Sequence, residues 1–243
     1  MLPLAAAAVA QTPPEIRARV EALSKTVLRD SAELPMDVAV TREITDAAGK
    51  IKSRATSHVK FLFHGFNPRN DTFKMNASAG LMSRRLMYDS MAGDVAFFVA
   101  LSNLAPRQGD ENRFDVKPGP DGHGFLIQTV RPECHDFVLS SNLLFPRNFC
   151  GSVDLFASAD GEGKLQIDRF VLEVRGLPRP GQVRYIGATR VTAFRAEGET
   201  QSVHIGSDPQ PYFVPKRAVT RVITEKGAVV LTNIYSVVPP GKR

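Results

Sequence analysis

Apolar and polar side chains alternate with a period of two along much of the chain, and this pattern constrains the fold most. Residues 36–44 and 59–63 alternate in this way on either side of a turn at residues 46–50, which predicts a long antiparallel hairpin. Further strands are predicted at residues 124–130, 152–156, 164–174, 183–194, 201–205, 212–224 and 228–238. We therefore expect a curved antiparallel sheet or a half-open β-barrel of about ten strands.

Two regions have helical spacing instead. Thr12-Pro13-Pro14-Glu15 is typical of a helix start, and an apolar stripe then predicts an amphipathic helix ending near Asp30. Residues 80–105 predict either two short helices or one helix broken at Gly93. The predicted fold class is mainly β with a few helices (α+β), with the helices on the concave face of the sheet.

The chain has 243 residues, a hydrophobic content of 43% and a charged content of 23%, which is ordinary for a globular protein. It contains no Ser/Gly-rich linker and no repeat, and no apolar run has the length of a membrane-spanning helix. We expect a single β-rich domain over residues 12–243, preceded by a signal-peptide remnant over residues 1–11.

The first residues read MLPLAAAAVA, and Ala8-Val9-Ala10 before Gln11 has the small-x-small form of a signal-peptidase site. An unstructured Ala-rich leader is the alternative. Export would place the protein in the periplasm or outside the cell, where Cys134 and Cys150 would form a disulfide, worth about 3 kcal/mol in the loop-entropy model. Two free thiols in a reducing compartment are the alternative.

The formal net charge is +6, but the basic residues are scattered rather than gathered in one patch. A nucleic-acid partner is therefore not expected. Most of these charges are interpreted as solvated surface, with an anionic partner such as lipid headgroups, and hence peripheral membrane contact, as the alternative.

The chain lacks the local motifs of common catalytic and cofactor sites. It has no Gly-x-Ser-x-Gly elbow, no phosphate-binding glycine loop and no CxxC pair. His58 and His64 lie six residues apart on one predicted strand, about 20 Å at the rise of a strand, so they cannot share an ion. We expect neither enzymatic activity nor a cofactor or metal.

Three segments in the carboxyl-terminal part of the chain form a recognisable pattern: Gly163–Asp168 before the strand that ends at Val174, then Pro209–Pro215, and the strand–turn–strand segment from Arg217 to Ser236. This pattern resembles periplasmic lipoprotein carriers of the LolA/LolB-like superfamily. The order of elements over residues 12–238 is also similar. This implies a half-barrel whose concave face, covered by helices, shelters acyl chains. No residue is matched to the family's ligand-gating arginine, and the Cys134–Cys150 segment departs from the pattern.

Apolar residues of the second helical region would suit the lining of such a site, with ordinary core as the alternative. They are Leu81, Met82, Leu86, Met87, Met91, Phe97, Phe98 and Leu101. The leading hypothesis is an exported envelope protein that binds lipid, or an acylated protein, in an apolar cavity between sheet and helices. An envelope assembly factor without a small-molecule ligand, and a hydrolase with an unrecognised site, are the alternatives. The oligomeric state is left open.

Overall fold

The structure of the protein is a computed structural model, and its described residues form mostly β-strands. It describes residues Glu15, 18–20, Ala22, 34–63, Asp89, 114–120, 124–131, 151–159, 165–174, 191–204 and 212–238. The strands are β1 (Leu34–Asp46), β2 (Ile51–Phe63), β3 (Asp115–Pro118), β4 (Phe125–Arg131), β5 (Gly151–Ala159), β6 (Leu165–Val174), β7 (Val191–Val203), β8 (Tyr212–Thr224) and β9 (Gly227–Val237).

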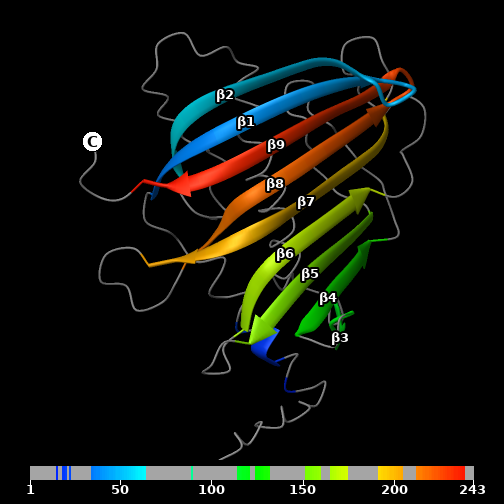
Figure 1. Cartoon of the computed structure of the whole chain (residues 1–243). Helices are drawn as coiled ribbons and strands as arrows, with labels where there is room; N and C mark the ends of the chain where they lie inside the picture. The colour runs from blue at the N-terminus through cyan, green and yellow to red at the C-terminus, as the bar shows by residue number, and fades with distance from the viewer. Residues whose placement is uncertain are drawn as a thin grey trace, which may run out of the picture.

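The strands form one antiparallel sheet in the order β2-β1-β9-β8-β7-β6-β5-β4-β3 (Figure 1). Neighbours in the sheet are neighbours in the chain, except that β9 returns to pair with β1. Within the described residues the sheet is open, with β2 and β3 at its two edges. The prediction of a mainly β fold is confirmed. The helices predicted on a concave face lie largely outside the described residues.

The long hairpin at the start of the sheet is confirmed. β1 and β2 pair from Leu34↔Phe63 to Thr45↔Ile51. The turn between them is organised by Asp46, whose Oδ1 accepts hydrogen bonds from the backbone N–H groups of Ala48 (3.0 Å) and Lys50 (2.9 Å). Gly49 takes a φ of +82°, which a residue without a Cβ adopts at little cost.

The prediction of two separate strands at residues 183–194 and 201–205 is wrong for the described part, because β7 runs without a break from Val191 to Val203. Sequence alone suggested a break around Gly198. That glycine is instead a strand residue, and a Cβ there would come within 2.5 Å of the Phe170 ring and 2.6 Å of the Arg217 carbonyl oxygen. Glycine is required here by packing rather than by a turn.

Pro215 lies inside β8, although prolines in sheets usually occur at the start of a strand or on an edge strand. The pairing of β7 with β8 shifts register between Glu199 and Thr200, and Pro215 pairs beside this irregularity. The described pairing of β8 with β9 begins only at Arg217↔Ile234. A proline lacks the N–H that a continuous ladder requires, so an irregularity is the place where a strand tolerates it.

The two faces of the sheet differ sharply. One face, which we call the apolar face, carries most of the buried core, whereas the other, the charged face, carries alternating acidic and basic residues. The buried residues of the apolar face include Met36, Val38, Val40, Val59, Ile127, Val153, Leu155, Phe170, Leu172, Phe194, Ala196, Ala218, Val222, Leu231 and Tyr235. The period of two in the sequence is thus the alternation of these two faces.

The described residues of the predicted N-terminal helix are helical: Glu15, residues 18–20 and Ala22. Val20, on the predicted apolar stripe, is fully buried, whereas Ala18 and Ala22 are exposed. This is the burial pattern of a helix that packs along one side.

Candidate functional site

A charged residue stands in the middle of the apolar face. Arg42 pairs with Leu231 across β1 and β9, which places it on the same face of the sheet as Val40, Asn233 and Val229 rather than on the charged face. Its Nη1 donates to Oδ1 and Oδ2 of Asp89, at 2.7 and 2.8 Å. The side chains of Arg42 and Asp89 are only 15% and 8% exposed. A buried ion pair therefore joins the sheet to a helical residue 47 positions further along the chain.

Asn233 on β9 completes the attachment of Asp89. Its Nδ2 donates to the backbone carbonyl oxygen of Asp89 at 2.9 Å and contacts the hydroxyl of Tyr235 at 3.1 Å. Asn233 is 1% exposed and Tyr235 is 3% exposed. The side chain and the backbone of Asp89 are thus held by separate strands, so its position over the apolar face is fixed from two directions. We call Arg42, Asp89, Thr220, Asn233 and Tyr235 the polar cluster.

Two buried polar atoms of this cluster have no hydrogen-bond partner in the part of the chain that the structure describes. They are Nε of Arg42 and Oγ1 of Thr220. Thr220 pairs with Leu231 on β8 and β9, and Leu231 pairs with Arg42, so all three side chains form one row across the apolar face. Buried polar atoms without a partner carry a desolvation cost of about 1–3 kcal/mol each, which makes this row an unusual place in an otherwise apolar surface.

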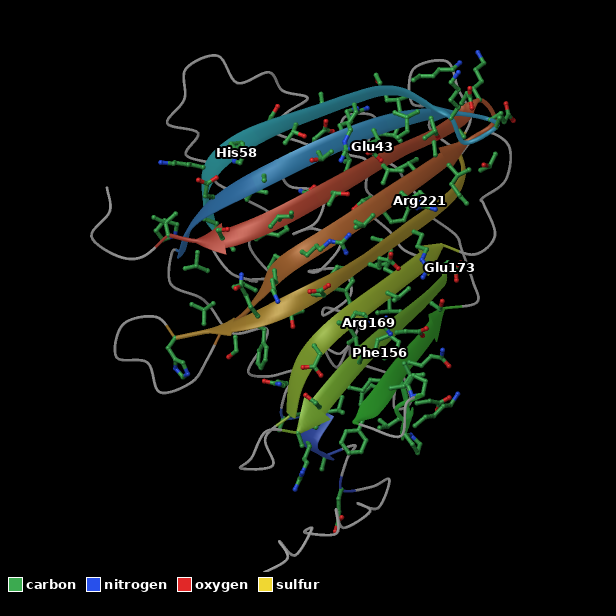
Figure 2. All side chains as sticks on the ribbon, viewed as in Figure 1. Glu43, His58, Phe156, Arg169, Glu173 and Arg221 are labelled. Carbon is green, nitrogen blue, oxygen red and sulfur yellow. The ribbon has the colours of Figure 1, made fainter. Side chains whose placement is uncertain are left out.

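The charged face carries several ion pairs among the described residues, and Figure 2 labels Glu43, Arg169 and Arg221 on this face. Its ion pairs are exposed, and positive and negative side chains alternate across the strands. They include Glu43–Arg54 at 3.1 Å, Arg195–Glu197 at 3.1 Å, Asp37–His58 at 3.8 Å and Lys216–Glu199 at 3.9 Å. Exposed pairs contribute about 0–1 kcal/mol each, so this face is interpreted as solvated surface.

One contact on the charged face involves an aromatic ring. The guanidinium carbon of Arg169 lies 3.9 Å from the centre of the Phe156 ring, and the two residues pair across β5 and β6. The arginine covers an apolar ring that would otherwise face water. This cation–π contact is worth about 0.5–1 kcal/mol at an exposed site.

The site residues predicted from sequence lie outside the described residues, as do both cysteines. Those predictions therefore stay predictions. Asp89 lies two residues from Met87 and two from Met91, in the middle of the predicted lining. Its contacts with Arg42 and Asn233 bring this part of the chain onto the apolar face at one described point.

Sequence reasoning missed Arg42, although a signal was present. Met36, Val38, Val40 and Ile44 share one parity in β1, and Arg42 has the same parity. A charge at a core-facing position requires a partner, because an unpaired buried charge is very costly. The alternation therefore pointed to a buried ion pair, but the partner was too distant in sequence to be identified.

Among the described residues, no group of three or more His, Cys, Asp and Glu side chains is arranged to hold a metal ion. In the same part of the chain, no helix has the length and apolarity needed to span a membrane.

Comparison with known proteins gives one finding of similarity. No protein-family model matches the chain, and no curated protein matches it. A crystal structure of a LolA superfamily protein from Nitrosomonas europaea is similar over 93% of this chain and 92% of that chain, with 11% sequence identity and a TM-score of 0.32. The superfamily is the one that the carboxyl-terminal motifs resemble. At this identity and TM-score, no residue role passes from that protein to this chain.

Proposed function

We propose that the chain is an exported envelope protein that binds lipid or the acyl chains of an acylated protein. The ligand would lie in an apolar cavity between the apolar face of the sheet and the region around Asp89. The proposal includes peripheral contact with a membrane, and it assigns a binding role rather than a catalytic one. Its natural location is the periplasm or the exterior of the cell.

The observation that carries this proposal is the mode of attachment of Asp89. An apolar face that extends across the sheet from β2 to β4 requires an apolar cover, because about 25 cal/mol is gained for each Å² removed from water. At Asp89 the described attachment is polar: an ion pair to Arg42 and a hydrogen bond to Asn233. Polar contacts can be exchanged for contacts with water, whereas interdigitated apolar side chains lose their burial when they separate. The polar contacts of Asp89 would therefore allow this part of the chain to separate from the sheet and admit a ligand.

The sequence supplies further support. Met82, Met87 and Met91 lie within seven positions of Asp89 in the sequence, and methionine adapts its shape to irregular apolar surroundings. The resemblance to lipoprotein carriers implies the same class of ligand. A buried CH₂ group contributes about 0.8 kcal/mol, so one long acyl chain suffices for micromolar binding after ordering costs.

Uptake of a fluorescent fatty acid by the purified protein tests this proposal. We expect saturable micromolar binding that an unlabelled acyl chain displaces, together with co-purified lipid in native mass spectrometry. A matched soluble protein without an apolar cavity serves as the control. The proposal would be contradicted if the protein took up no probe and no acyl compound displaced it.

A further inference from the structure

The polar cluster contains two buried polar atoms, Arg42 Nε and Thr220 Oγ1, that have no hydrogen-bond partner among the described residues. We propose that Arg42 is the binding residue for the anionic headgroup of a single-chain lipid, and that the Asp89 carboxylate is an internal competitor for the same guanidinium. This inference rests on the proposed lipid-binding function and names the class of ligand that the site selects. The shared chemistry is an anion at the end of one acyl chain, either a carboxylate or a phosphate.

The first argument is the way in which Arg42 is used. A guanidinium has five N–H donors and binds carboxylates or phosphates through two parallel hydrogen bonds. Here a single nitrogen, Nη1, contacts both oxygens of Asp89, while Nε is buried and has no hydrogen-bond partner within the described ranges. A ligand anion that accepts from Nε would satisfy this donor, which Asp89 in its present position does not. Binding of the anion would therefore give Arg42 Nε the hydrogen bond that it lacks without a ligand.

The second argument is independent and comes from Thr220. Its hydroxyl is buried, with the residue 1% exposed, and none of the described residues forms a hydrogen bond with it. Thr220 lies two strands from Arg42 in the same row of the apolar face, roughly 10 Å away at the spacing of neighbouring strands. The sheet neighbours of Thr220 on this face are Ala196 and Leu231, neither of which offers it a polar side-chain group. A hydroxyl or ester oxygen of a bound lipid could pair with it.

The third argument concerns charge. The pair of Arg42 and Asp89 is neutral as a unit, so an added anion would leave a buried net negative charge unless it replaced Asp89 on the guanidinium. Binding of the headgroup therefore competes with the ion pair. A neutral acyl ester offers Arg42 a hydrogen-bond acceptor but no compensating charge, so an anionic lipid of the same chain length should bind more tightly.

The test compares three ligands of the same chain length with the wild-type protein: laurate, methyl laurate and lauroyl lysophosphatidate. Each displaces a neutral fluorescent dye from the purified full chain. A hydrogen bond to a charged group corresponds to roughly 10-fold in affinity or more, so we expect at least one anionic ligand to bind about 10-fold more tightly than methyl laurate. Preference for laurate identifies the carboxylate, and preference for lysophosphatidate identifies the phosphate.

Two variants locate the effect. Asp89→Asn removes the competing charge and should raise affinity for the preferred anion about 10-fold while changing the affinity for methyl laurate less than 2-fold. Arg42→Gln should abolish the preference for the anion. Arg54→Gln, on the charged face, is the matched control and should preserve it. Folding of each variant is checked by circular dichroism, and the wild-type comparison decides the question if a variant does not fold.

The outcomes separate the two proposals. If methyl laurate binds as tightly as both anions to the wild-type protein, the headgroup site is refuted and lipid binding stands. The same conclusion follows if the preference survives in folded Arg42→Gln. If none of the three ligands binds, lipid binding itself fails, and the headgroup site fails with it.

Discussion

Arg42 Nη1 lies 2.7 Å from Oδ1 and 2.8 Å from Oδ2 of Asp89, and this ion pair is buried on a face whose other residues are mostly apolar. Most proteins place such pairs at the surface, because removing two charges from water costs several kcal/mol for each ion. The pair is compensated by its geometry and by the hydrogen bond from Asn233 to the Asp89 backbone. The net contribution of the ion pair to stability is therefore small. Its main effect is to fix the position at which Asp89 contacts the sheet.

Removing one member of the pair should destabilise the protein strongly. Arg42→Met leaves the Asp89 carboxylate buried without its partner, and we expect a loss of about 3–5 kcal/mol in the free energy of unfolding. The double variant Arg42→Met with Asp89→Leu should recover most of this loss, because no buried charge remains. Urea unfolding followed by circular dichroism measures both values.

The control for this comparison is the exposed pair Glu43–Arg54 on the charged face. Arg54→Met should change the free energy of unfolding by less than about 1 kcal/mol, since the side chain of Arg54 is 65% exposed. Equal losses for Arg42→Met and Arg54→Met would contradict the special position of Arg42.

A methyl group at Gly198 should destabilise the junction of β6, β7 and β8. In Gly198→Ala the new Cβ would meet the Phe170 ring at 2.5 Å and the Arg217 carbonyl oxygen at 2.6 Å. Overpacking of this kind costs about 1–3 kcal/mol. Adding Phe170→Leu should not restore stability, because the backbone contact remains and a buried ring is lost. Thermal unfolding measures the shift, and an unchanged midpoint for Gly198→Ala would show that the strands adjust freely.

A charge in the predicted lining should weaken acyl binding. Met87→Glu places a carboxylate where an apolar chain is expected, so the affinity for a fluorescent fatty acid should fall at least about 10-fold. Ile234→Glu makes a similar change on the charged face, at a residue that is 49% exposed, and should leave affinity unchanged. Equal affinities of both variants and the wild-type protein would remove Met87 from the lining.

Cys134 and Cys150 are predicted to form a disulfide. The chain has two cysteines, and a bridge between them would restrict the unfolded state by about 3 kcal/mol in the loop-entropy model. Thiol titration of the unfolded, unreduced protein should find no free sulfhydryl. Two titratable thiols would contradict the bridge.

The mature chain should begin at or near Gln11 and lie outside the cytoplasm. The small residues Ala8 and Ala10 occupy the positions that signal peptidase selects. Amino-terminal sequencing after expression and fractionation tests this. A cytoplasmic protein that retains Met1 would exclude export.

The sequence alone was sufficient for the elements whose formation is local. The period of two located β1 and β2 around their turn, and β8 and β9 around theirs, since alternating side chains identify a strand with one buried face. The mainly β class followed from the number of such segments. The turn at Asp46 followed from residues that bond to their own neighbouring backbone.

Only the tertiary structure decided the features that depend on distant residues. Gly198 is a strand residue because Phe170 occupies the space of its side chain, and Pro215 is tolerated inside β8 because the ladder is irregular there. Arg42 shows most clearly which information comes from the sequence and which comes from the tertiary structure. Its parity in β1 indicated a buried charge, but its partner is Asp89, which comes into contact only when the chain folds over the apolar face. Alternation along a strand specifies which face a side chain occupies, whereas the residue that covers this face is selected by packing between segments far apart in sequence.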